Sequence, residues 1–286
     1  MRVQEHTITL AEGPVFYRSA RPEESAASRV ESPGGGAPVP LYLHGAPTSS
    51  DDWIGLLERT GGLAPDLLGF GRSAKGGHLE YSPESLADFL NDLLSKLAVE
   101  EVQLVLQGWG TAAGVLLAAR YPERVERMVL FNSVPLLPGL TWPWWARQWR
   151  IRAVGELAMG STTKTVLTRW LRRGATNPAA WPTDRIDQTW NHFDQGTQRA
   201  ILRLQRSADE EHQRVMAAAL ESLRVPVLVI WGEQDPWWGA DVLDAYAARL
   251  PEAQIERLPD ASHWPWLDDP AAIRLVASFL GAPDDH

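Results

Sequence analysis

The chain contains no cysteine among its 286 residues. This absence excludes a disulfide framework, thiol catalysis and zinc–thiolate sites, and it is compatible with a reducing cytoplasm. No run of basic residues is present and the net charge is −9 at pH 7, so we expect neither nucleic acid nor an anionic membrane as the main partner. No apolar run approaches membrane-spanning length, and the first residues, Met1 to His6, lack the apolar region of a secretory signal. We therefore predict a soluble, cytoplasmic protein.

Tryptophan, in contrast, is abundant: the chain has 14, more than a core of this size needs. Seven of them lie between residues 136 and 223, a stretch with helical composition and no strand pattern: Trp142, Trp144, Trp145, Trp149, Trp170, Trp181 and Trp190. Some of these rings would simply pack the helices together, and others would line a pocket for an apolar ligand.

Strand and helix patterns alternate on both sides of this stretch. Residues 3–19 predict a β-hairpin, and apolar runs at 39–43, 102–106, 125–131, 225–231 and 255–258 predict buried strands. Ser82 and Pro83 start a helix whose apolar residues repeat at helical spacing. We predict an α/β fold with a doubly wound, mostly parallel sheet. Residues 1–135 and 224–286 would form this core, and 136–223 a helical Trp-rich cap over the sheet's C-terminal edge, where ligands bind in such folds.

The stretch 104–111 predicts a strand, a glycine-rich turn and a helix. This is the context of a nucleophile elbow, in which a Ser, Asp or Cys stands at the apex of the turn. Here the apex residue is Gly108, which has no side chain that could attack a substrate. The elbow therefore predicts a site whose nucleophile position is vacated.

Three further motifs follow predicted strands in a fixed order around the elbow. His44-Gly45 comes before it, Gly232-Glu233-Gln234-Asp235 follows the strand 225–231, and Ala261-Ser262-His263 follows the last strand. Nucleophile, then acid, then histidine is the chain order of the α/β-hydrolase fold.

The chain resembles the haloalkane dehalogenase and epoxide hydrolase branch of the α/β-hydrolases. The segments that carry the resemblance are His44-Gly45-Ala46-Pro47-Thr48-Ser49-Ser50, the turn at 65–73 and Gln107-Gly108-Trp109-Gly110, which is similar to the family's QDWG. The resemblance implies Asp235 as the acid, His263 as the general base, and the backbone N–H groups of Ala46 and Trp109 as the oxyanion hole.

The departures from this family matter as much as the matches. The family's nucleophilic aspartate corresponds to Gly108, and the asparagine that helps to hold halide corresponds to Ala46, although one halide-binding tryptophan is kept as Trp109. Residues 136–223 contain no tyrosine, whereas epoxide hydrolases polarise the epoxide with cap tyrosines. These departures count against dehalogenation and covalent epoxide opening.

The remaining His263–Asp235 pair predicts general acid–base chemistry without a covalent intermediate. We expect an enzyme that uses neither cofactor nor metal and acts on a hydrophobic small molecule as a lyase, cyclase or decarboxylase, or by direct activation of water. Its pocket is predicted to include Trp109, Trp145, Trp149 and Trp264. The motifs specify neither the substrate nor the oligomeric state.

Three different functions stay open from the sequence. The protein could be a catalytically dead homologue that only binds a small molecule. It could be a dehalogenase or epoxide hydrolase variant whose nucleophile was deleted. It could also be an esterase with a displaced hydroxyl nucleophile, for which the candidates are Ser49, Ser50, Thr111, Ser133 and Ser262, each also interpretable as a cap or turn residue. Asp66 is expected to make a structural hydrogen bond.

Overall fold

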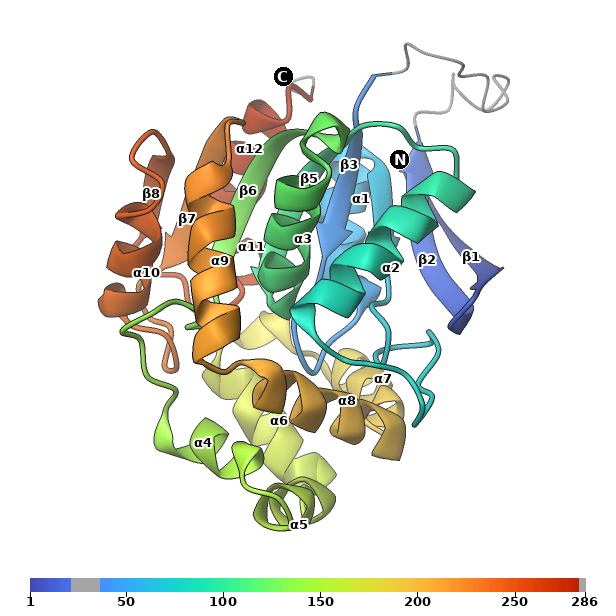
Figure 1. The fold of residues 1–286 in the computed structure, drawn as a ribbon, viewed down its shortest axis with the longest axis vertical. Helices are drawn as coiled ribbons and strands as arrows, with labels where there is room; N and C mark the ends of the chain where they lie inside the picture. Colours follow the sequence, from blue (N-terminus) through green and yellow to red (C-terminus); the bar gives the residue numbers. More distant parts are fainter. Residues whose placement is uncertain (22–36, 283–286) are drawn as a thin grey trace.

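The computed structural model describes residues 1–21 and 37–282 (Figure 1). The sequence between residues 21 and 38 is rich in proline, serine and glycine, which predicts a surface loop, and its residues 22–36 lie outside the described residues. Between these limits the chain folds around one sheet, with helices on both faces and a group of helices at one end (Figure 1).

The sheet has eight strands in the order β1-β2-β4-β3-β5-β6-β7-β8. β1 and β2 form the predicted antiparallel hairpin, β2 pairs antiparallel with β4, and all other neighbours are parallel. This is the mostly parallel, doubly wound sheet that the sequence predicted. The strands are β1 (Arg2–Leu10), β2 (Gly13–Arg21), β3 (Val39–Leu43), β4 (Gly62–Pro65), β5 (Val102–Gly108), β6 (Val125–Ser133), β7 (Val227–Gly232) and β8 (Gln254–Leu258).

Helices that follow the strands cover both faces of the sheet. Figure 1 shows α2, α3 and α9 across the near face, with α1, α11 and α12 behind. The predicted stripe of α2 is buried from Leu86 to Leu94, and the Ser82 side chain caps the helix as expected. The core helices are α1 (Ile54–Thr60), α2 (Pro83–Lys96), α3 (Trp109–Arg120), α9 (Glu210–Ser222), α10 (Ala240–Ala247), α11 (Pro265–Asp268) and α12 (Pro270–Phe279), with short 3-10 turns at Ser50–Trp53 and Pro122–Arg124.

Five helices gather at the lower end in Figure 1: α4 (Trp144–Arg150), α5 (Val154–Gly160), α6 (Lys164–Arg173), α7 (Thr183–His192) and α8 (Gln195–Ser207), with a 3-10 turn at Pro178–Ala180. The sequence predicted a cap that ends at residue 223. In the structure α9, which lies within that range, packs along α3 on the sheet face. The reason is its composition, because Met216, Ala217, Ala219 and Leu220 form an apolar face that α3 covers.

Side-chain bonds tie the cap to the core. The Arg185 guanidinium of α7 donates to the buried Asp52 carboxylate at 2.8 Å, and Lys75 pairs with Asp194 at 2.9 Å. Burial raises the pKa of Asp52, and the Arg185 charge opposes that rise. The cap is therefore held against the strand ends by a buried ion pair. Among residues 1–21 and 37–282, no helix is long and apolar enough to cross a membrane.

Candidate active site

The turn between β5 and α3 has the backbone of an elbow with glycine at its apex. Gly108 has φ 55° and ψ −124°, a region that strains residues with a side chain. A Cβ placed on Gly108 would lie 3.0 Å from the Gly45 Cα, so the space beside the apex is narrow. Trp109 is the first residue of α3, and its N–H therefore has no acceptor within the helix.

His263 and Asp235 come from different loops and meet above the elbow. Asp235 follows β7 and His263 follows β8, and the His263 Nδ1–H donates to Asp235 Oδ2 at 2.7 Å. Both side chains are buried, with exposed fractions of 6% and 0%. Because Nδ1 carries the proton shared with the carboxylate, the Nε2 lone pair is directed away from Asp235.

The Asp235 carboxylate is held by donors on both of its oxygens. Oδ2 also accepts a bond from the Asn132 amide at 2.9 Å, and Oδ1 accepts from the backbone N–H groups of Trp237 at 2.9 Å and Trp238 at 3.2 Å. Four donors fix the carboxylate in one orientation. Asp235 therefore orients the imidazole as a rigid partner.

Asn132 is a site residue that the sequence reasoning did not identify. It lies near the end of β6, and its amide also exchanges two hydrogen bonds with the backbone of Gly232, at 3.1 and 2.9 Å. It thus joins the ends of β6 and β7 and positions Asp235. A polar residue at the carboxyl end of a central strand was the available signal.

Gln107 is the second residue that went unidentified. Its side chain is buried, and its Nε2–H donates to the His263 Nε2 at 2.8 Å. Its Oε1 lies over Gly45, where an added Cβ would come within 2.4 Å of it. The residue before the vacated apex therefore contacts the nitrogen that a general base would use.

The predicted oxyanion-hole residues, Ala46 and Trp109, both line one pocket together with Gly108 and His263. His44 is buried and holds the loop that carries Ala46: its Nδ1–H donates to Gly45 O at 2.8 Å, and its Nε2 accepts from the Leu67 N–H at 3.0 Å. The two backbone N–H groups proposed for the hole thus belong to segments fixed by buried contacts.

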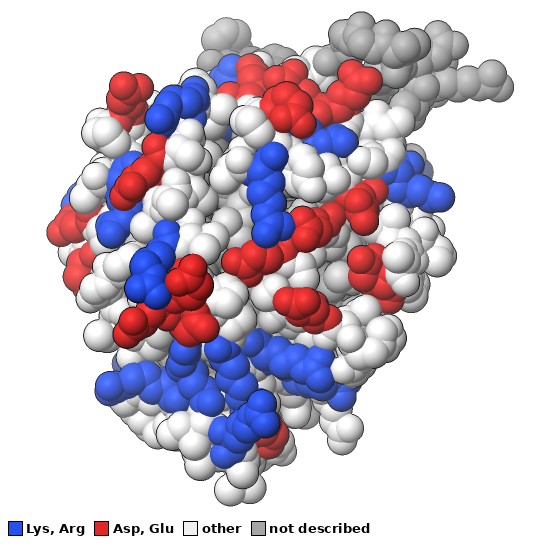
Figure 2. All heavy atoms as spheres, viewed as in Figure 1, with Lys and Arg blue, Asp and Glu red and all other residues white. Residues whose placement is uncertain are grey.

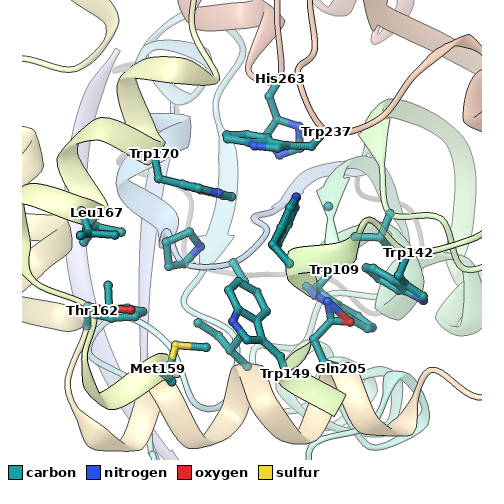
Figure 3. A pocket seen from close by; sticks show the side chains of 18 of the residues that line it. Trp109, Trp142, Trp149, Met159, Thr162, Leu167, Trp170, Gln205, Trp237 and His263 are labelled. Atoms are coloured by element: carbon teal, nitrogen blue, oxygen red, sulfur yellow. The ribbon is translucent and has the colours of Figure 1, made fainter. Parts of the chain in front are cut away.

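The pocket has a cavity volume of about 120 Å³ and a largely apolar lining. Figure 3 shows His263 and Trp237 at one end, with the rings of Trp109, Trp149 and Trp170 around the space. No charged side chain lines it, and its polar side chains, apart from the tryptophan indoles, are Thr162, Gln205 and His263. The lining tryptophans number seven: Trp109, Trp142, Trp145, Trp149, Trp170, Trp237 and Trp238.

Trp264 differs from the expectation that it lines the pocket. It is 1% exposed and packs behind His263, with ring centroids 4.8 Å apart in a T-shaped contact. It also packs against Trp181, with centroids 4.8 Å apart. The other three predicted rings, Trp109, Trp145 and Trp149, do line the pocket. Trp237 flanks His263 from the pocket side, with centroids 4.7 Å apart.

The hydroxyl groups considered as replacement nucleophiles are engaged elsewhere, and none lines the pocket. Thr111 and Ser133 bond to each other at 2.9 Å, and Ser262 donates to Gln234 O at 3.1 Å. Ser49 caps the turn Ser50–Trp53, and Ser50 Oγ lies 3.4 Å from Arg18 Nη1.

Asp66 makes the structural bonds expected of it. It accepts hydrogen bonds from the N–H groups of Ser50 at 2.8 Å and Arg72 at 2.7 Å. In residues 1–21 and 37–282, no group of three or more acidic or histidine side chains is arranged to hold a metal ion.

Known proteins resemble this chain over most of its length. The sequence profile of the α/β hydrolase fold family matches residues 38–270, and the chain belongs to that family. A haloalkane dehalogenase of Mesorhizobium japonicum is 30% identical over 277 residues, covering 90% of this chain and 88% of the relative. A cis-3-alkyl-4-alkyloxetan-2-one decarboxylase of Shewanella oneidensis is 28% identical over 256 residues, covering 81% and 77%.

Solved structures show the same fold. The epoxide hydrolase CorEH without ligand superposes with a TM-score of 0.79 at 19% identity, covering 98% of this chain and 99% of that one. A loop variant of the haloalkane dehalogenase DbeA from Bradyrhizobium elkanii gives a TM-score of 0.78 at 23% identity, covering 98% and 97%. The predicted resemblance to this branch of the α/β-hydrolases is therefore confirmed.

Proposed function

We propose that the protein is an enzyme of α/β-hydrolase fold that uses His263, oriented by Asp235, as a general acid and base on a hydrophobic small molecule, without a covalent nucleophile or a cofactor. The observation that carries the proposal is the 2.7 Å His263–Asp235 bond at a pocket whose elbow apex is Gly108. His263, Ala46 and Trp109, the residues of the proposed base and of the two proposed backbone donors, line the same pocket as Gly108.

Each group has a defined task in this scheme. His263 Nε2 takes or returns a proton, and such general acid–base catalysis contributes roughly 10²- to 10⁴-fold. The N–H groups of Ala46 and Trp109 stabilise an oxyanion, which contributes on the order of 10²- to 10³-fold per donor. The volume left free at Gly108 holds the reacting atom of the substrate or a water molecule.

Gln107 adjusts to the protonation state of His263. Its amide donates to the neutral imidazole, and a half-turn about its last bond would present Oε1 to a protonated Nε2 instead. The Gln107 amide therefore donates to His263 Nε2 until the substrate arrives. Its oxygen then accepts a hydrogen bond from the imidazolium and stabilises it.

The pocket favours an apolar substrate that carries an oxygen function. Seven tryptophans line it, and the buried Nε1 groups of Trp142 and Trp238 have no hydrogen-bond partner within the described residues. Because these two Nε1 atoms are shielded from the pocket, the partners proposed for a substrate oxygen are the backbone N–H groups of Ala46 and Trp109. Lyase, cyclase or decarboxylase chemistry and direct hydrolysis all meet these conditions, and a relative named for the decarboxylation of an alkyl-substituted oxetanone is consistent with them.

Replacement of His263 tests the proposal. We expect His263→Ala to lower turnover by roughly 10²- to 10⁴-fold on whichever member of a panel of hydrophobic lactones, esters and β-keto acids the wild type converts, because the base is lost. His78→Ala, which removes an exposed histidine outside the pocket, is the matched control. Undiminished turnover by folded His263→Ala would overturn the mechanism.

A second candidate is a protein that binds a small molecule without converting it. The observation that favours it is the Gln107 bond to His263 Nε2, which satisfies the nitrogen that a base must keep free. In that case a ligand quenches tryptophan fluorescence, no product forms, and His263→Ala binds the ligand as tightly as the wild type.

An esterase and a nucleophile-deleted dehalogenase receive less support from the site, and each has its own test. A displaced serine would react with a serine-directed covalent probe, although the candidate hydroxyl groups lie outside the pocket lining. A dehalogenase that had lost its nucleophile would regain halide release from a haloalkane in Gly108→Asp.

A further inference from the structure

The charge of the chain is unevenly distributed between the cap segment and the rest. Residues 136–223 hold 12 Lys and Arg against 8 Asp and Glu, whereas the whole chain holds 27 against 36. The segment therefore carries +4 and the remainder −13. Figure 2 shows Lys and Arg gathered across the cap in the lower part of the view, while acidic side chains predominate on the surface just above it.

Exposed apolar side chains concentrate in the same segment. Of the eight large apolar residues exposed in the described chain, five lie on α4, α5, α6 or the connection between α4 and α5. Trp144 is 66% exposed and Leu157 is 75% exposed. The other three are Ile151, Val154 and Val166. We call these five residues the apolar tip.

Arginines without acidic partners accompany the apolar tip. Arg147 and Arg152 are exposed, and the side chain of neither makes an ion pair or hydrogen bond within residues 1–21 and 37–282. Arg152 also lines a surface hollow of about 730 Å³ together with three arginines of α8, Arg199, Arg203 and Arg206. Glu156 is the acidic residue of this hollow, and it is already paired with Arg206 at 2.8 and 2.9 Å.

The basic hollow and the apolar pocket adjoin. Met159 of α5 lines both, and α8 presents Ile201 and Gln205 to the pocket and its arginines to the hollow. Val166 is at once part of the apolar tip and part of the pocket lining. Val166 therefore connects the outer surface of the cap with the lining of the pocket that contains His263.

We infer that the cap tip, formed by the apolar tip and the arginines around it, docks on an anionic lipid surface from which the pocket takes its apolar substrate. Exposed Trp and Leu enter the interfacial region of a bilayer, and the arginines contact acidic headgroups, one of which would lie in the hollow. This docking does not depend on which reaction the pocket carries out.

The surface fits lipid better than the other partners of a basic face. Nucleic acid binds a positive groove or stripe, whereas here exposed leucine, isoleucine and valine stand among the arginines. A second copy of the chain, placed cap against cap, would bring like charge against the unpaired side chains of Arg147 and Arg152. The expectation of no membrane partner came from the total charge, and the cap has the opposite sign.

Vesicle sedimentation with the full chain tests the inference. We expect binding to phosphatidylcholine vesicles that contain phosphatidylglycerol, weaker binding to phosphatidylcholine alone, and release at high salt. Arg147→Gln with Arg152→Gln should lower the partition coefficient by roughly fivefold per charge removed. Trp144→Ser with Leu157→Ser should lower it by more than about tenfold, since both substitutions remove apolar surface that would enter the bilayer.

Matched controls lie outside the cap. Arg274→Gln removes an exposed arginine of α12, and Ile255→Ser removes a 38% exposed apolar residue of β8. Both should bind vesicles like the wild type. The inference fails if the wild type binds neither vesicle, if the controls weaken binding as much as the cap variants, if the chain binds a DNA duplex in preference to vesicles, or if the apolar tip instead mediates self-association. Turnover is not measured, so this outcome is separate from that of the proposed reaction.

Discussion

The two sides of the pocket differ in what they contribute to chemistry. On one side, His263 and Asp235 are side chains fixed by a dense set of hydrogen bonds that includes Asn132 and two backbone amides. On the other side, the elbow offers only backbone: Gly108 has no side chain, and Trp109 presents an N–H at the start of α3. In the proposed reaction the elbow therefore supplies backbone donors, and the opposite side supplies the acid–base pair.

The elbow backbone forms with no side chain at its apex. The turn is set by β5 ending beside β3 and β6 and by α3 packing on the sheet. Glycine adopts φ 55° without strain, so removing a side chain there costs nothing in the fold. The pair on the other side depends on its side chains entirely.

A change in the His263–Asp235 pair should have the largest effect, and it should act on turnover. We expect Asp235→Asn to lower turnover by roughly 10³- to 10⁴-fold, because an amide can donate to Nδ1 and select the wrong tautomer of His263. Ring ¹⁵N NMR should show the proton moving from Nδ1 to Nε2. Asp241→Asn, on the exposed start of α10, is the control. Retention of the Nδ1–H tautomer in Asp235→Asn would contradict the assigned role.

A change in the elbow backbone should alter the free energy of unfolding. Gly108→Ala is expected to lower the free energy of unfolding by about 1–3 kcal/mol, since Ala is strained at this φ and its Cβ would lie 3.0 Å from Gly45. Gly55→Ala is the opposite case: it lies in α1 with nothing within 4 Å of an added Cβ, so it should be stabilising by about 0.5–1 kcal/mol. Urea denaturation measures both. Equal stability of the two variants would show that the elbow is not strained.

Loss of the hydrogen bond between Gln107 and His263, which joins the elbow to the His263–Asp235 pair, should have the smallest effect. Gln107→Met removes the donor to His263 Nε2. It should lower the free energy of unfolding by about 0.5–1.5 kcal/mol, the net value of one neutral hydrogen bond. The His263 Nε2 resonance should shift in Gln107→Met and stay in place in Gln103→Met, which alters another buried glutamine of β5. An unchanged Nε2 resonance in Gln107→Met would remove Gln107 from the site.

Much of the fold followed from local patterns. The hairpin, the parallel strands and the stripe of α2 were readable because each depends on residues close together in sequence. The position of α9 could not be predicted in the same way. The sequence of an amphipathic helix shows that it has an apolar face, but it does not show which neighbour covers that face. The candidate acid and base were placed by the chain order of a fold, and the structure brings them to 2.7 Å.

Side-chain detail within the site was harder to predict. Asn132 and Gln107 look like ordinary strand residues until their strands lie beside Gly232 and His263. Trp264 was expected in the pocket because it adjoins His263, but successive residues of an extended loop point in different directions. Its ring therefore packs behind the imidazole, and Trp237, from the loop after β7, takes the pocket side.

The sequence by itself determined the α/β-hydrolase fold, the glycine at the elbow apex and the order in which acid and histidine follow it, because these depend on periodicity and on motifs carried by short segments. Tertiary structure decided which tryptophans line the pocket, which amide contacts the histidine, and where the positive charge of the cap meets its exposed apolar residues. Such properties arise from contacts between segments far apart in the chain, and burial and direction of side chains at those contacts are set only when the segments pack.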